Sequence, residues 1–128
     1  MMSDLGADAV RGYLLDLQGQ ICTALEQEDG VARFQSLTLE REGGGSARPR
    51  VLSDGAVLER AAVNFSHTVG ARMPEAATVR RPELAGQSFQ AASLSLIVHP
   101  LNPYAPTSHC NLRCFVTDGK GSDTFWWF

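Results

Sequence analysis

The stretch from His99 to Phe115, HPLNPYAPTSHCNLRCF, concentrates residue types that can perform chemistry. Its two histidines stand on either side of a loop with three prolines, and Asn111 and Arg113 follow the second histidine, His109, at alternate positions. Imidazole exchanges a proton near neutral pH, and a carboxamide both donates and accepts hydrogen bonds. A guanidinium binds a carboxylate through two parallel hydrogen bonds. Together these types predict a binding site for a small acidic substrate.

Two predicted strands would present these side chains on one face of a sheet, because successive side chains in a strand point to opposite faces. In SHCNLRCFV the apolar or thiol side chains share one face, namely Cys110, Leu112, Cys114 and Val116. The opposite face carries His109, Asn111 and Arg113. In SFQAASLSLIVH one face carries Leu94, Leu96 and Val98, and the other carries Ser93, Ser95, Ile97 and His99.

If the two strands are antiparallel neighbours, one register to test places His99 opposite His109 and Ser95 opposite Arg113. Ile97 then lies opposite Asn111, and directly opposed side chains have their Cβ atoms about 5 Å apart. The connecting loop, residues 100–108, is long for a hairpin, so separated strands are the alternative. The shared polar face does not depend on which alternative holds.

A divalent metal bound by His99 and His109 is a second interpretation of the same residues. Two imidazoles do not close a metal site, so further ligands would come from His67 or from sequence outside these 128 residues. The spacing of the two histidines matches no standard zinc pattern. A purely structural role of the strand histidines is the third interpretation.

The segment REGGGSARPR forms a glycine-rich and arginine-rich loop. With Arg41, Arg48 and Arg50 it is either an anion cradle built from backbone N–H groups or a flexible loop. It does not match the phosphate-loop pattern, because no G-K-[ST] follows the glycines.

The first thirty residues predict one amphipathic helix. Its apolar stripe recurs at spacings of four, three, four and four, at Val10, Leu14, Leu17, Ile21 and Leu25. Ser3 or Asp4 is the expected cap at its start, and Asp29-Gly30 is the expected end.

The rest of the chain predicts strands. Residues 34–40 alternate, with Leu37 and Leu39 on one side, and Ser53-Asp54-Gly55 is the expected turn of a hairpin. AAVNFSHTVG continues as a strand, and residues 74–86 are an expected loop with a short helical turn. A helix followed by mostly antiparallel strands is an α+β fold, with the sheet flanked by helices.

Composition excludes several classes of protein. The chain is 44% hydrophobic with a net charge of −3, which disfavours nucleic acid as a partner despite the arginine-rich middle third. It lacks a signal-peptide pattern and any apolar run of the ~18 residues that a transmembrane segment needs. Three cysteines, an odd number, argue against a disulfide framework. A reduced, cytoplasmic protein follows as the expectation.

The segment SDTFWWF at the end of the sequence reads as a buried strand rather than as a polar terminus. We therefore expect residues 1–128 to form a single partial domain of a longer sheet-and-helix protein. The alternative is an aromatic C-terminal strand docked in its own core.

Longer motifs identify a family. EREGGGSARPRVLSDGAVLERAAVNFSH, RPELAGQSFQAASLSLIVHPLNPYAPTSHCNLRCFV and WWF occur in this order. Over roughly residues 5 to 128 the chain resembles the oxygen-dependent coproporphyrinogen III oxidases. The resemblance implies oxidative decarboxylation of two propionates of coproporphyrinogen III to vinyl groups, giving protoporphyrinogen IX in heme biosynthesis. It also implies O₂ as oxidant, no organic cofactor, and a homodimer with a large antiparallel sheet between helical layers.

The resemblance also implies residue roles. Ser95 and the segment Asn111, Leu112 and Arg113 would contact the substrate, and His109 would be the proton donor. His99 and His109 match positions assigned to a divalent metal. Ser95, both histidines, Asn111 and Arg113 also follow from the alternation along the two strands, independently of the family.

The chain also departs from the family pattern. Family members are more than twice as long, and their remaining part supplies other metal-site histidines, substrate contacts and most of the dimer interface. FQSLTLEREGGGS lacks the acidic-tryptophan pattern that many members show. We therefore expect these 128 residues alone to be inactive, and a non-catalytic tetrapyrrole- or anion-binding module is the alternative function.

Overall fold

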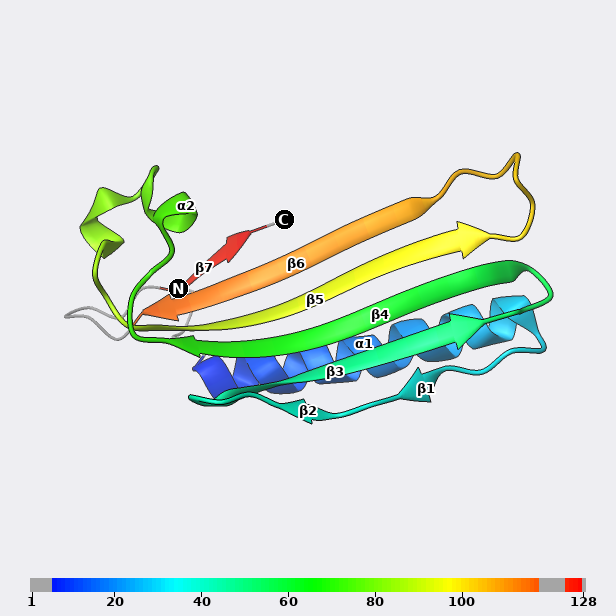
Figure 1. The fold of residues 1–128 in the computed structure, drawn as a ribbon, viewed down its shortest axis with the longest axis horizontal. Helices are drawn as coiled ribbons and strands as arrows, with labels where there is room; N and C mark the ends of the chain where they lie inside the picture. The colour runs from blue at the N-terminus through cyan, green and yellow to red at the C-terminus, as the bar shows by residue number, and fades with distance from the viewer. Residues whose placement is uncertain (1–5, 118–123, 128) are drawn as a thin grey trace.

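The computed structural model describes residues 6–117 and 124–127, in which one long helix lies along one face of an antiparallel sheet (Figure 1). This arrangement confirms the predicted α+β fold class. The sheet is long and narrow in outline, and the helix runs beneath its strands for most of their length.

The elements follow one another with short connections. In chain order they are α1 (Ala7–Asp29), β1 (Gln35–Ser36), β2 (Leu39–Glu40), β3 (Gly45–Ser53), β4 (Leu58–Gly70), α2 (Glu75–Thr78), the 3₁₀ helix η1 (Pro82–Leu84), β5 (Phe89–Pro100), β6 (Ser108–Thr117) and β7 (Thr124–Trp127). Among the described residues the strand order is β1-β3-β4-β5-β6-β7, with β2 also paired to β3. Every one of these pairings is antiparallel.

Helix α1 ends where the sequence predicted. Gly30 adopts a left-handed conformation with φ of 80°, and its N–H donates to the carbonyl of Glu26 at 2.9 Å. At the other end the helix begins after Gly6, whose carbonyl accepts from Ala9 and Val10. The predicted caps Ser3 and Asp4 lie outside the described residues.

The buried stripe of α1 is centred on a polar residue. Val10, Leu14 and Cys22 are buried with Gln18 between them, whereas the other members of the predicted stripe, Leu17, Ile21 and Leu25, are only partly buried. Gln18 Nε2 donates to the carbonyl oxygens of Arg48 (2.7 Å) and Val63 (2.8 Å). A buried amide needs such partners, and here they join the helix to β3 and β4.

The two faces of the sheet carry separate hydrophobic clusters. Against α1 lie the buried residues Val10, Leu14, Cys22, Val63, Phe65, Ala92, Leu94 and Cys114. On the opposite face, at one end of the sheet, lie Met73, Ala77, Leu84, Phe89, Ala91 and Phe115. The two clusters lie on opposite faces because successive side chains of β5 alternate between the faces, so that Ala91 belongs to one cluster and Ala92 to the other.

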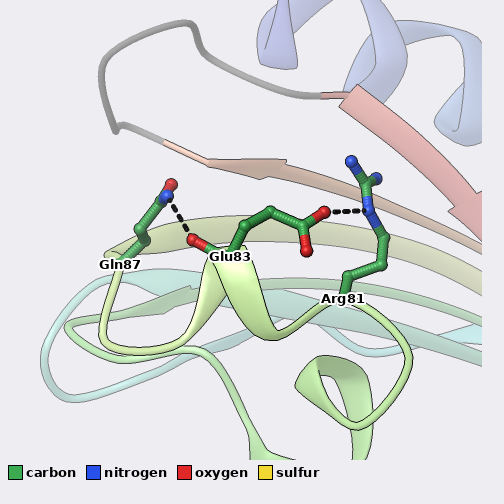
Figure 2. A network of polar contacts seen from close by, with 3 residues as sticks. All are labelled: Arg81, Glu83 and Gln87. Atoms are coloured by element: carbon green, nitrogen blue, oxygen red, sulfur yellow. Dashed lines mark hydrogen bonds and ion pairs between the residues drawn. The ribbon is translucent and has the colours of Figure 1, made fainter.

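The segment between β4 and β5 covers the second cluster and contains the predicted short helical turn. Figure 2 shows its polar contacts: Arg81 Nε lies 3.0 Å from Glu83 Oε1, and Gln87 Nε2 donates to the carbonyl of Glu83 at 3.1 Å. The Arg81 guanidinium also lies 5.0 Å from the centre of the Phe125 ring, a cation–π distance. The contact between Arg81, the residue before η1, and Phe125 joins this segment to β7 on the face opposite α1.

The predicted single strand over residues 34–40 is instead two short strands. β1 pairs with β3 up to Ser36, β2 resumes the pairing at Leu39, and Pro49 of β3 lies opposite the gap. Leu37 N–H donates to the carbonyl of Pro49 at 3.1 Å, but proline has no N–H to return the bond. The ladder is interrupted at that residue, and both Leu37 and Leu39 are exposed.

Asp29 holds the end of α1 to the β3–β4 hairpin. Its buried carboxylate accepts hydrogen bonds from the backbone N–H groups of Val31, Ala32, Ala56, Val57 and Leu58 at 2.8 to 3.3 Å. These donors stabilise the charged form and hold the pKa of this carboxyl far below its ordinary value. A Cβ atom added at Gly55 would collide with the same carboxylate, so the turn residue must be glycine.

We expect Asp29→Asn to destabilise the fold at pH 7, because a neutral amide accepts weaker hydrogen bonds than a carboxylate. The native pKa is depressed, so the stabilising contribution is complete above the unfolded pKa of about 3.9 and disappears as the pH falls through the native value. The difference between variant and parent should therefore narrow below about pH 4. Urea unfolding curves of both proteins at pH 7, 4 and 3 measure this difference in the free energy of unfolding.

Asp16→Asn is the matched control, because Asp16 is exposed on α1 and accepts a single hydrogen bond, from Gln20. It should leave the unfolding midpoint nearly unchanged at all three pH values. Equal midpoints for Asp29→Asn and the parent at pH 7 would show that the carboxylate does not hold the hairpin.

Candidate functional site

Three neighbouring strands bring polar side chains into rows on the sheet face opposite α1. In one row Ser95 of β5 lies between Asn64 of β4 and Asn111 of β6. In the next row Ser93 lies between Ser66 and Arg113. We call this surface the open face; its polar members are Asn64, Ser66, Ser93, Ser95, His99, His109, Asn111 and Arg113. All of them are exposed or half-buried.

The structure confirms that β5 and β6 are antiparallel neighbours, but the predicted register is wrong. His109 lies opposite Ile97 rather than His99, and Arg113 lies opposite Ser93 rather than Ser95. Each partner is displaced by two positions. Because strand side chains repeat every two residues, this displacement leaves all of the predicted residues on the predicted face.

The loop between β5 and β6 accounts for the displacement. The last pair of the ladder is Val98 with Ser108, and the loop beyond it has hydrogen bonds of its own. Asn102 accepts from Tyr104 N–H through its side chain at 2.9 Å, and Leu101 N–H donates to the carbonyl of Val57 at 2.8 Å. The end of β5 is therefore held by the β3–β4 hairpin and by an Asx turn. Neither contact can be read from alternation within the strands.

The two histidines are diagonal neighbours on the open face. His99 is half-buried, pairs with Arg60 of β4, and has its Nδ1 within 3.3 Å of Thr107 Oγ1. His109 is exposed near the loop end of β6. Diagonal positions on adjacent strands are separated by about 7–8 Å, so the two imidazoles share one neighbourhood without facing each other directly.

His67, the predicted third metal ligand, lies on the other side of the sheet. Its side chain points to the sheet face opposite that of Asn64 and Ser66, because successive side chains of β4 alternate between the two faces. His67 is buried, and its Nε2 lies 3.1 Å from Gln90 Oε1. No cluster of three His, Cys, Asp or Glu side chains that could hold a metal ion occurs among residues 6–117 and 124–127. Within the described part of the chain, His99 and His109 therefore have no third protein ligand beside them and do not complete a metal site.

Two members of the predicted substrate-binding segment line a hollow along the edge of β6. A depression of about 500 Å³ is lined by His109, Cys110, Asn111 and Leu112. The structure places the side chain of Leu112 on the α1 side, where it packs against the helix cluster. Leu112 is therefore at the rim of this hollow and not on the open face with Asn111.

Arg113 lies beside an aromatic group. It is exposed and pairs across the sheet with Ser93 on one side and Trp127 on the other. The Phe115 ring stacks on Phe125 with centroids 5.2 Å apart and is tilted against Trp127 at 6.1 Å. The open face thus adjoins an aromatic group of which Trp127 is the exposed member, because Phe115 is buried and Phe125 is half-buried beside Arg81.

Arg41 reaches the open face from the glycine turn between β2 and β3. Its Nη2 donates to Ser66 Oγ at 3.0 Å and its Nη1 donates to Thr68 Oγ1 at 3.3 Å. Gly45, with φ of 96°, has no room for a Cβ because that atom would meet the carbonyl of His67. The turn therefore needs glycine to place Arg41 over β4.

The three arginines of the glycine-rich segment, which was expected to be either an anion cradle or a flexible loop, do not come together, and residues 45–50 belong to strand β3 instead. Arg48 and Arg50 pair with Phe65 and Val63 and share their face of the sheet, on the α1 side, whereas Arg41 lies on the opposite side. Arg50 lies 5.9 Å from the centre of the Phe34 ring. Both arginines line a groove between α1 and β3 and have no part in the open face.

Sequence reasoning missed Asn64 and Ser66 as site residues, and it named Arg41 only as part of a cradle with Arg48 and Arg50 and not with the polar strand face. The signal for the first two was present, because VNFSH alternates apolar and polar residues in the same way as the two strands that were analysed. No comparable signal exists for Arg41, whose position depends on the conformation of the glycine turn.

The three cysteines are free, as their odd number predicted. Burial raises the pKa of the Cys22 and Cys114 thiols, which lie in the helix cluster and not on the open face. No helix within the described part of the chain is long and apolar enough to cross a membrane.

Comparison with protein families gives one match over nearly the whole chain. The family model described as Coproporphyrinogen III oxidase matches residues 9–128. The match includes α1 from its third residue, every later element to β7 and all residues of the open face.

We expect the chain to bind Zn²⁺ or Mn²⁺ only weakly, because the described residues offer two imidazoles where tight sites use three or more protein ligands. Isothermal calorimetry should give shallow curves without a stoichiometric end point. The variant His67→Gln should behave like the parent, since His67 lies on the α1 side. Tight one-to-one binding that disappears in this variant would contradict the proposed geometry.

Proposed function

The chain belongs to the coproporphyrinogen III oxidase family, and we propose that its open face holds coproporphyrinogen III during oxidative decarboxylation in heme biosynthesis. We further propose O₂ as the oxidant. One observation supports the substrate-binding proposal: the rows Asn64–Ser95–Asn111 and Ser66–Ser93–Arg113 lie side by side, next to the exposed ring of Trp127. A tetrapyrrole with carboxylate side chains needs polar groups for the carboxylates and apolar surface for the rings.

The atoms and electrons exchanged in the reaction determine which groups the site must provide. Each propionate, R–CH₂–CH₂–COO⁻, reacts with O₂ and one proton to give R–CH=CH₂, CO₂ and H₂O₂. The C–C bond to the carboxylate breaks and its electron pair forms the double bond, whereas O₂ takes up the hydrogen of one C–H bond with both bonding electrons, together with one added proton. The site must therefore bind carboxylates, position one propionate and supply a proton.

Arg113 fits the first task, because an exposed guanidinium binds a carboxylate through two hydrogen bonds. Ser95 and Asn111, directly opposite each other, add a hydroxyl and a carboxamide that donate or accept as the substrate requires. A strong carboxylate anchor stabilises the ground state of the group it holds. Arg113 therefore suits a propionate that is not losing CO₂ at that moment.

His109 fits the proton-supplying role. Its imidazole is exposed on the open face and lines the same hollow as Asn111, so it is accessible to a substrate at that edge of the sheet. A histidine can hold a proton near neutral pH and release it in the reaction. The incomplete ligand set at His99 and His109 supports no reaction step through a metal.

A non-catalytic tetrapyrrole-binding module is the second candidate. It is favoured by the exposure of Asn64, His109 and Arg113, because exclusion of water from the reacting groups requires a covering layer. We propose that these 128 residues alone bind the substrate but do not turn it over. A homodimer and a cytoplasmic location are proposed on the family resemblance only.

Replacing Arg113 by alanine should weaken binding of coproporphyrin III, the stable oxidised form of the substrate, about tenfold. This loss, about 1.4 kcal/mol, lies just below the range of a charged hydrogen bond, as expected for an exposed site. Fluorescence titration at fixed salt measures it. Arg48→Ala, on the α1 side, is the control and should bind like the parent; equal losses in both variants would indicate attraction by overall charge instead.

Replacing His109 by asparagine in the longer chain that the resemblance implies should lower kcat by ~10²-fold or more, the usual contribution of a general acid–base group. KM should change little, because the amide retains a polar contact. Steady-state formation of protoporphyrinogen IX under air measures both constants. A variant that loses binding and keeps its turnover would show His109 to be a structural or binding residue.

A further inference from the structure

Arg41 is held on the open face by neutral partners. Its two terminal nitrogens donate to the hydroxyls of Ser66 and Thr68, two residues on the same side of β4. Among the described residues no carboxylate pairs with it, so its charge is not compensated there. A guanidinium carries five N–H donors, and the two hydroxyls use two of them. The remaining donors are available to a ligand.

The position of Arg41 relative to Arg113 is fixed by the register. Ser66, to which Arg41 is bonded, and Arg113 are both paired with Ser93, one from each side. Adjacent strands lie about 4.8 Å apart, so the backbone positions of Ser66 and Arg113 are separated by roughly 10 Å. Two guanidinium groups therefore stand on either side of Ser93 in one row across the sheet.

We infer that Arg41 is a second carboxylate anchor, and that the open face binds a ligand through two of its carboxylates at once. This inference rests on the proposed function, because it takes the ligand to be a tetrapyrrole with several propionates. One anchor holds a propionate that is not reacting while another propionate of the same molecule lies near His109. Ser66 acts as a positioning residue for Arg41.

A structural role explains Arg41 less well. Its two hydrogen bonds are exposed, and exposed polar contacts contribute little to stability. Its neighbour Gly45 is restricted to glycine by the close approach of β4, so the turn is determined without the arginine side chain. Because the hydroxyls of Ser66 and Thr68 already hold the Arg41 side chain, that side chain loses less conformational entropy when a ligand binds.

The test is a comparison of two probes by fluorescence titration at fixed salt. The first probe is coproporphyrin III with four free carboxylates, and the second is the same porphyrin with one free carboxylate and three methyl esters. Arg41→Gln should weaken binding of the tetra-acid about tenfold. It should weaken binding of the mono-acid less than about twofold, because Arg113 can take the single carboxylate.

Ser66→Ala should give a smaller loss in the same direction, and only with the tetra-acid. Arg48→Gln is the control for charge alone and should change neither affinity. Two outcomes would overturn the inference and leave the proposed function standing. In the first, Arg41→Gln weakens binding of both probes to a similar extent. In the second, Arg41→Gln binds the tetra-acid like the parent, whereas Arg113→Gln binds it more weakly. A parent protein that does not bind the tetra-acid, or that binds it equally after Arg113→Gln, would overturn both.

Discussion

The antiparallel pairing of β5 with β4 and β6 determines where the candidate functional groups of these three strands lie. It places Ser95 between Asn64 and Asn111 and gives the three strands a common alternation. Every second side chain faces α1, and the others face away from it. The chemistry of the open face is therefore a direct consequence of a packing requirement on the other side of the sheet.

Helix α1 enforces that requirement. Its buried stripe needs an apolar partner surface, which Val63, Phe65 and Leu94 supply. The Gln18 amide and the Asp29 carboxylate then fix the helix by hydrogen bonds to β3, to β4 and to the hairpin between them. A slip of one residue in any of the three strands would bury polar groups under the helix, so the same contacts that stabilise the core also specify the site.

Most of the fold and the facing of the site could be predicted from local patterns. Periodicity identified α1, its end at Gly30 and the two strands whose shared face carries His109, Asn111 and Arg113. The β5–β6 register, the break opposite Pro49 and the side of the sheet on which His67 lies were not predicted, or were predicted wrongly. The first two depend on contacts between segments, namely Leu101 with Val57 and Leu37 with Pro49. The side of the sheet on which His67 lies could have been predicted from the alternation in VNFSH. The position of Arg41 could not, because it depends on the backbone of three consecutive glycines with positive φ.

The central claim is that a carboxylated tetrapyrrole lies on the open face, and side-chain amide signals in ¹H–¹⁵N spectra test it directly. The amides of Asn64 and Asn111 lie on the open face, whereas those of Gln20 and Gln27 line the groove between α1 and β3, where Arg48 and Arg50 offer a competing anion site. A porphyrin ring shifts the resonances of nearby protons strongly. On titration with coproporphyrin III the account predicts shifts of the two asparagine amides and unchanged glutamine amides. Shifts of Gln20 and Gln27 with unchanged asparagine signals would contradict it.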